Sequence, residues 1–60
     1  MSDATVRLDY DKIRANTADA YLLEFGDDNV WVPKSQISTI FEKKKVVHMS
    51  EWFAKKKGLI

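Results

Sequence analysis

The sequence predicts a mainly β fold: a small antiparallel sheet, curled toward a partial barrel of the SH3-like or OB-like kind, with a short C-terminal helix. Apolar and charged residues alternate from Val6 to Tyr10, which is the period of a half-buried strand. The acidic segment 26–29 separates two stretches rich in β-branched and aromatic residues, as in a β-hairpin. Residues 51–57 are followed by Gly58, the residue type that commonly ends a helix.

The chain of 60 residues predicts one small domain over residues 1–60. A domain of this size buries only roughly 60% of the surface of its unfolded chain, so its core is marginal. The sequence contains no cysteine, which excludes a stabilising disulfide and a thiolate zinc site. We therefore expect a homo-oligomer, which would bury further surface between subunits. The polar start and the lack of a long apolar run predict no secretory signal, no membrane segment and a cytoplasmic location.

The first half of the chain predicts two strands and a turn. The first strand covers residues 6–10 and continues, after a kink, through residues 13–15. Residues 16–19 form a turn, because asparagine, threonine and aspartate side chains bond their own backbone. The next strand spans residues 20–25, with alternate side chains on opposite faces.

The central hairpin is the best-defined predicted element. Residues 26–29 form its loop, and the chain returns through residues 30–32. Pro33 has no backbone donor, so it ends that strand or leaves it at an edge of the sheet. Residues 34–37 then form a single tight turn.

Residues 38–49 allow two interpretations. Apolar residues at helical spacing after the proline favour a helix. The β-branched pair Val46-Val47 and the lysine run 43–45, which suits a solvated turn, favour a second hairpin that pairs residues 39–42 with residues 46–49. We prefer the hairpin and keep the helix as the alternative.

The C-terminal segment predicts a helix of about two turns over residues 51–57. Ser50 can accept the free amide hydrogens of the first turn, and Glu51 lies near the positive end of the helix dipole. Gly58 supplies the left-handed stop, and Leu59 packs back as the hydrophobic residue of a Schellman motif. So short a helix has to dock on the sheet or on another subunit.

Charge is distributed unevenly, although the formal net charge is only +1. Residues 1–30 carry three bases and seven acids, a net charge of −4, whereas residues 31–60 carry seven lysines and two acids, a net charge of +5. This asymmetry fits faces that meet between subunits, a basic surface for an anionic partner, or solvated charges on unrelated faces. The candidate basic patch for phosphate groups comprises Arg14, Lys34, Lys43, Lys44 and Lys45.

Trp31 and Trp52 are the candidate aromatic contact residues. Trp31 points away from Val30 and Val32, so its indole lies near the surface if the valines are core. There it can stack on a base, anchor a partner protein or cover a second small core. Trp52 and Phe53 are adjacent on a short helix and cannot both face one core, so one of them contacts a subunit or a ligand.

No catalytic signature is present. The single histidine, His48, falls in a predicted strand and lacks the nucleophile and orienting group of a catalytic triad. The two acidic pairs lie in a strand and in a turn, and no glycine-rich loop could cradle phosphates. The calcium-loop spacing is also absent. We therefore expect no enzymatic activity, no cofactor and no metal.

Two segments carry a resemblance to known proteins. The tract VWVPKSQI at residues 30–37 and the segment EWFAKKKGLI at residues 51–60 resemble small uncharacterised proteins of bacteriophages and prophages. The resemblance covers about residues 10–60, apart from the lysine runs, where those proteins are more acidic. It implies an accessory phage gene product in the host cytoplasm. Such products often bind nucleic acid or inhibit host machinery, including immune systems.

The leading hypothesis is a non-enzymatic accessory protein that binds and neutralises a host target by stoichiometric sequestration. The target would be a protein of the host defence system or the nucleotide-type anionic signal that the defence system uses. The alternative is a nucleic-acid-binding module that stacks bases on Trp31 and contacts phosphates with its lysines.

Overall fold

The computed structural model describes residues 4–60, which form six strands, one 3-10 turn and one short α-helix. In chain order the elements are β1 (Thr5–Asp9), β2 (Lys12–Asn16), β3 (Ala20–Phe25), β4 (Asp28–Pro33), η1 (Lys34–Gln36), β5 (Ile37–Phe41), β6 (Val46–Ser50) and α1 (Glu51–Lys56).

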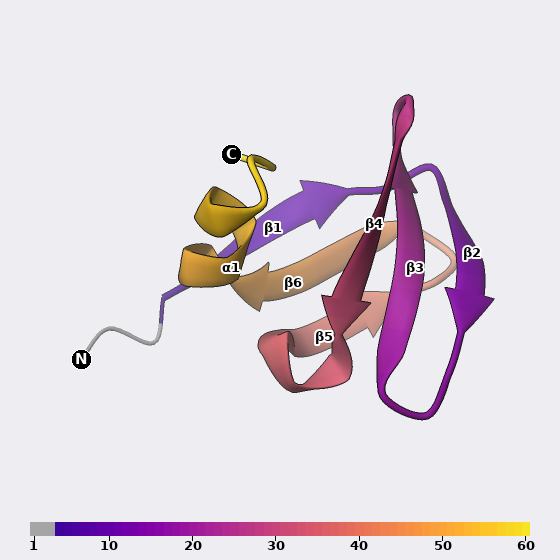
Figure 1. The fold of residues 1–60 in the computed structure, drawn as a ribbon, viewed down its shortest axis with the longest axis horizontal. Helices are drawn as coiled ribbons and strands as arrows, with labels where there is room; N and C mark the ends of the chain where they lie inside the picture. The colour runs from indigo at the N-terminus through magenta and orange to yellow at the C-terminus, as the bar shows by residue number, and fades with distance from the viewer. Residues whose placement is uncertain (1–3) are drawn as a thin grey trace.

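The strands form two antiparallel sheets of three strands each. Sheet A has the order β1-β6-β5 and sheet B the order β2-β3-β4. The strands of the two sheets cross at a steep angle in Figure 1. The mainly β prediction with a C-terminal helix is confirmed. The single sheet curled toward an SH3-like or OB-like barrel is corrected to two separate sheets, and the described strands form no closed or curled sheet.

The chain changes sheets at Tyr10 and Asp11. The amide of Tyr10 donates to the carbonyl of Lys45 in the β5–β6 turn, at 2.9 Å. The next amide, that of Asp11, donates to the carbonyl of Glu24 in β3, at 2.7 Å. Consecutive amides thus bond to different sheets. This explains why the predicted continuation of the first strand is instead a separate strand, β2.

A two-residue turn closes the β3–β4 hairpin. Phe25 pairs with Asp28, so the loop is shorter than the predicted segment 26–29. Gly26 takes φ +63° at the first turn position, where type II′ turns favour glycine. Its amide donates to Oδ2 of Asp11 at 2.7 Å, so a side chain from outside the hairpin also holds the turn.

The hairpin interpretation of residues 38–49 is confirmed, and the helix is wrong. β5 and β6 pair in antiparallel fashion and are joined by the turn 42–45, in which Lys45 takes φ +57°. A register shift between Ile37 and Thr39 inserts one extra residue into β5. The predicted tight turn after Pro33 is the 3-10 turn η1.

The predicted N-cap at Ser50 and the predicted glycine stop at Gly58 are confirmed, and the helix, Glu51–Lys56, ends one residue before the predicted bound. The hydroxyl of Ser50 accepts the amide of Phe53 at 3.1 Å as an N-cap. At the other end, Gly58 takes φ +72° and donates to Lys55, while Leu59 donates to Ala54. These two bonds define a Schellman motif.

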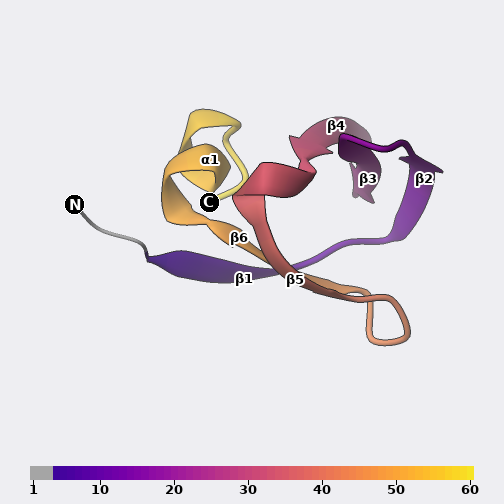
Figure 2. The ribbon, with the colours of Figure 1, turned by 90° about the horizontal axis from the view of Figure 1, so that it is seen from below.

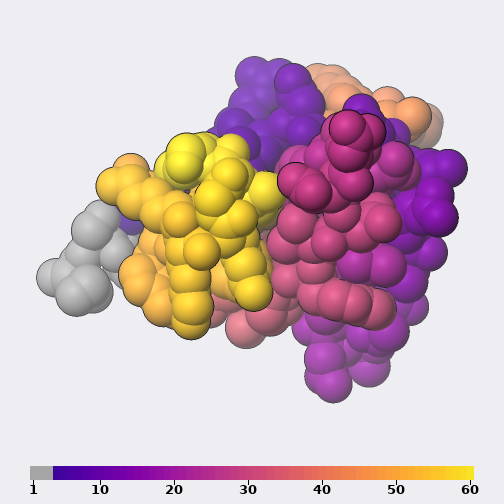
Figure 3. Space-filling model, turned by 45° about the horizontal axis from the view of Figure 1, so that its top comes forward, coloured from indigo at the N-terminus to yellow at the C-terminus, as the bar shows by residue number. Residues whose placement is uncertain are grey.

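One hydrophobic cluster joins the two sheets and α1. Figure 2 shows α1 and sheet B on the same side of sheet A, and among residues 4–60 no element covers the opposite face of sheet A. In the space-filling view the C-terminal segment (yellow) and β4 (magenta) form neighbouring masses at the surface (Figure 3). No helix of residues 4–60 is long and apolar enough to cross a membrane. The buried cluster comprises Tyr10, Leu23, Val32, Val47, Met49, Phe53 and Ala54.

Candidate ligand-binding grooves

The predicted basic patch is divided among three places. Arg14 Nη1 lies 3.6 Å from Glu24 Oε1, so its charge is partly balanced within sheet B. Lys34 Nζ lies 4.8 Å from the ring centroid of Tyr21, a cation-π contact. Strand β5 separates Lys34 from the lysine turn 43–45. Its five residues span roughly 15 Å. Of the five residues of the predicted basic patch, Lys44 alone lines a groove of the described structure.

Both predicted tryptophans are exposed. Trp31 is 50% exposed and lies opposite Leu22 of β3, on the face of sheet B that points away from the buried Val32. Trp52 is 62% exposed, whereas its neighbour Phe53 is buried in the core. The helix therefore docks through Phe53 and presents Trp52 at the surface.

The first groove, which we call the basic groove, has a volume of about 240 Å³. His48 alternates along β6 with Val47 and Met49 of the buried cluster, and Arg7 of β1 pairs with His48, so the groove lies on the face of sheet A that points away from the core, near the β5–β6 turn. Its lining comprises Arg7, Phe41, Lys44, Val46 and His48.

The basic groove combines positive charge with an aromatic ring. Arg7 and Lys44 supply two cations, and no carboxylate lines the groove. The carboxylate nearest in the strand register is Asp9, opposite Val46. The rings of Phe41 and His48 meet edge to face, with centroids 5.6 Å apart. A small open groove of this kind can hold an anionic group beside an aromatic face.

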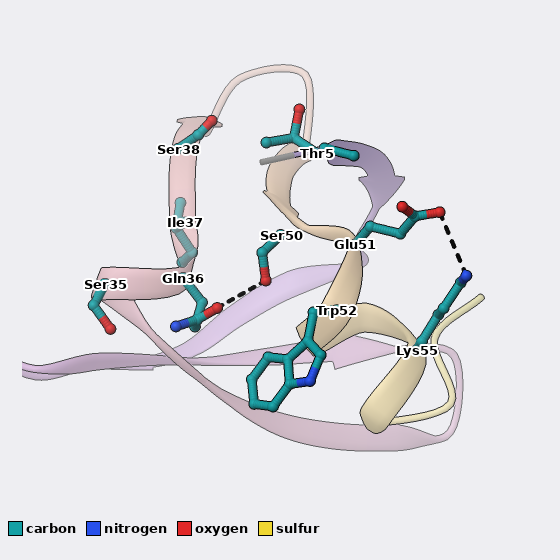
Figure 4. A pocket seen from close by; sticks show the side chains of 10 residues that line it. Thr5, Ser35, Gln36, Ile37, Ser38, Ser50, Glu51, Trp52 and Lys55 are labelled. Atoms are coloured by element: carbon teal, nitrogen blue, oxygen red, sulfur yellow. Dashed lines mark hydrogen bonds and ion pairs between the residues drawn. The ribbon is translucent and has the colours of Figure 1, made fainter. Parts of the chain in front are cut away.

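The second groove, the neutral groove, lies between η1 and the start of α1 and has a volume of about 500 Å³. Figure 4 shows the hydroxyl of Ser50 pointing toward Gln36, with the indole of Trp52 extending from the start of α1. Glu51 and Lys55 form an ion pair of 3.6 Å at its rim, so the lining carries no net charge. The lining comprises Ala4, Thr5, Ser35, Gln36, Ile37, Ser38, Ser50, Glu51, Trp52 and Lys55.

Sequence reasoning missed most residues of both grooves. Arg7 and His48 come from opposite ends of the chain and meet only because β1 pairs with β6. Alternation within β1 could have placed Arg7 on an outer face, but it could not have identified the partner strand. Gln36 lies within the tract at residues 30–37, but the sequence alone does not place it beside α1, where it accepts a hydrogen bond from Ser50 and lines the neutral groove.

No protein-family model, curated protein or solved structure matches this chain. Within residues 4–60, no group of three or more histidine, aspartate or glutamate side chains is placed to hold a metal ion. The chemistry of the grooves therefore rests on their own residues.

Proposed function

We propose that this chain is a phage-type, non-enzymatic accessory protein that binds a nucleotide-type anion in the basic groove and neutralises a host defence signal by sequestration. The observation that supports this proposal is the pair of cations, Arg7 and Lys44, beside the exposed ring of Phe41. The resemblance to small phage proteins supplies the biological context.

The groove residues suit the parts of such a ligand. The guanidinium of Arg7 can make two parallel hydrogen bonds to a phosphate, and Lys44 adds a second cation. The imidazole of His48 adds a ring N–H donor, and Phe41 offers a surface for the base. The groove is too small to enclose a nucleotide, since enclosing pockets measure roughly 300 Å³ or more. The ligand would therefore lie partly in solvent, and the effect would come from occupancy alone.

The test is titration of the protein with nucleoside triphosphates and cyclic dinucleotides, followed by native mass spectrometry and calorimetry. We expect one ligand per chain in the basic groove, recovered chemically unchanged. Arg7→Glu should lower the affinity roughly tenfold or more, because it removes a charge-assisted hydrogen bond and adds repulsion. The control Lys12→Glu makes the same kind of change in sheet B, outside both grooves, and should bind as the parent does. Equal losses in the two variants would exclude the basic groove.

A nucleic-acid-binding module is the second candidate. It is favoured by the exposed Trp31 on sheet B and by the adjacency of the two grooves. Thr5 and Ser50, a cross-strand pair in the neutral groove, lie two residues from Arg7 and His48, or about 7 Å along the strands. Such a module would lose affinity for oligonucleotides steeply with salt, and Lys43→Glu would weaken all sequences alike. Salt-insensitive capture of one small ligand would favour sequestration instead.

We also propose that the chain works as a homo-oligomer. Its support is the amount of large apolar surface left outside the core in so small a protein. Native mass spectrometry at micromolar concentration tests the proposal, and a monomer throughout the concentration range would contradict it. The exposed large apolar residues are Trp31, Phe41, Trp52 and Ile60.

A further inference from the structure

The hydrogen bonds around Ser50 set the orientation of the Gln36 amide. Ser50 Oγ accepts the amide hydrogen of Phe53, so the single hydroxyl proton of Ser50 is free to be donated elsewhere. It is donated to Gln36 Oε1, at 2.7 Å. Since a hydroxyl donates only to an acceptor, the oxygen of the Gln36 amide faces Ser50, and its NH₂ group is the end turned away from Ser50 (Figure 4).

Trp52 offers the stacking surface of the same groove. Lys56 Nζ lies over its ring, 4.9 Å from the centroid, and occupies one face of the indole. The side chain remains 62% exposed and lines the groove. An indole that lines the groove and is largely exposed is suited to stacking a flat aromatic ligand.

The neutral groove selects against strongly charged groups. The carboxylate of Glu51 is held by Lys55, and the remaining polar side chains are hydroxyls and the Gln36 amide. A phosphate would find no unpaired cation in this lining. The two grooves therefore suit different ligand groups. The basic groove suits a phosphate, and the neutral groove suits an uncharged ring.

We propose that the neutral groove is a nucleobase-binding site that prefers a base with a ring carbonyl, stacked on Trp52 and bonded through that carbonyl to the NH₂ group of Gln36. A glutamine reads adenine by using both ends of its amide, accepting from the amino group and donating to N7. Here the oxygen end is turned to Ser50, so only the donor end faces a ligand. Uracil and thymine present the matching acceptor oxygens, whereas adenine also needs an acceptor in the protein.

This site does not depend on the function proposed for the basic groove. Its ligand needs no phosphate, and none of its lining residues belongs to the basic groove. A nucleoside lacks the phosphate that Arg7 and Lys44 would hold, so signals of Trp52 and Gln36 report its binding to the neutral groove and signals of Phe41 report any binding to the basic groove. Inorganic pyrophosphate tests the basic groove alone.

The experiment is a titration of isotope-labelled protein with uridine, adenosine and ribose, followed by NMR of the side-chain N–H signals. We expect uridine to shift the NMR signals of the Trp52 indole N–H and the Gln36 NH₂ group. The signal of the Trp31 indole N–H should not change. Adenosine should bind about fivefold more weakly, the worth of roughly one hydrogen bond, and ribose should not bind detectably. Equal shifts with ribose, or shifts centred on Trp31, would overturn the proposal.

Two variants separate recognition from folding. Ser50→Asp keeps an N-cap acceptor but has no proton for Gln36, so the amide is free to turn and the preference for uridine should fall toward parity with adenosine. Trp52→Ala removes an exposed side chain and should weaken both nucleosides about tenfold or more, with the fold retained. Unchanged selectivity in Ser50→Asp, or unchanged affinity in Trp52→Ala, would sink the assignment, whatever the basic-groove ligands do.

Discussion

Phe41 and His48 meet edge to face on the uncovered side of sheet A, with ring centroids 5.6 Å apart and an interplanar angle of 71°. They come from the paired strands β5 and β6, so the register of the hairpin maintains the contact. The contact restrains the Phe41 ring beside the cations of the basic groove, although the side chain is 43% exposed. An aromatic side chain on an open sheet face is thereby kept in a defined position.

Replacing Phe41 should separate stacking from charge in the basic groove. Phe41→Ala should lower nucleotide affinity about tenfold, because the stacking of a base on an aromatic ring contributes roughly 1–3 kcal/mol. Pyrophosphate affinity, measured by calorimetry, should stay unchanged, since the cations remain. Thr39→Ala, on the same face of β5, is the matched control. An equal loss for both ligands would show that Phe41 does not stack on a base.

Tyr10 should make the protein less stable at alkaline pH. Burial raises the pKa of its phenol above the ordinary 10.0, and the nearby charges of Glu42 and Tyr21 raise it further. Below pH 10 the phenol is protonated in both states, and its contribution is fully present. As the pH rises toward the folded-state pKa, the unfolded chain ionises first and that contribution is lost.

Tyr10→Phe should remove this alkaline loss. The buried hydroxyl has no hydrogen-bond partner in the described part of the chain, so its removal should leave stability at pH 7 equal or raise it by about 1 kcal/mol. Urea denaturation of parent and variant at pH 7 and pH 10.5 measures both effects. A variant that loses stability with pH as steeply as the parent would assign the alkaline loss to other groups.

The N-cap of α1 should contribute measurably to stability. Ser50→Ala should cost about 1 kcal/mol, because the amide of Phe53 loses its acceptor. Ser50→Asp should retain most of the stability, since a carboxylate also caps the helix. Ser35→Ala, at the rim of the neutral groove, is a control that removes a hydroxyl without touching the cap. Denaturant titration measures the free energy of unfolding of each variant. An unchanged value in Ser50→Ala would mean that water replaces the cap.

The contribution of Gly58, at the end of α1, to stability should depend on its backbone conformation alone. Gly58 takes φ +72°, and a Cβ at this position would meet no atom within 4 Å. Gly58→Ala should therefore cost about 1 kcal/mol from the left-handed conformation, with no added clash. Gly58→Asn should cost less, because asparagine tolerates this region better. Thermal unfolding of the two variants tests the order, and a larger cost for asparagine would contradict it.

Local patterns predicted most of the elements, and long-range pairing accounts for most of the errors. The strand Ala20–Phe25, the N-cap at Ser50 and the Schellman motif at Gly58 follow from neighbours in sequence. The division into two sheets does not, because it depends on where the amides of Tyr10 and Asp11 find acceptors.

The candidate site shows the same limit. Exposure of Trp31 followed from its alternation with Val30 and Val32. The residues of the predicted basic patch lie in separate places, with Arg14 and Lys34 in contact with Glu24 and Tyr21 of sheet B and the three lysines in the β5–β6 turn. Charge counted along the chain indicates that cations are present, but only the register of the strands shows which of them face one another.

The pairing of β1 with β6 also sets an order of folding. Sheet B is built from neighbouring hairpins within residues 12–33, so its strands can pair early at little entropic cost. Sheet A cannot be completed until Thr5 meets Ser50, near the other end of the chain. Until β6 pairs with it, β1 leaves Val6 and Leu8 uncovered. In pulsed hydrogen exchange during refolding of the whole chain, the amides of β3 should accordingly become protected before those of β1.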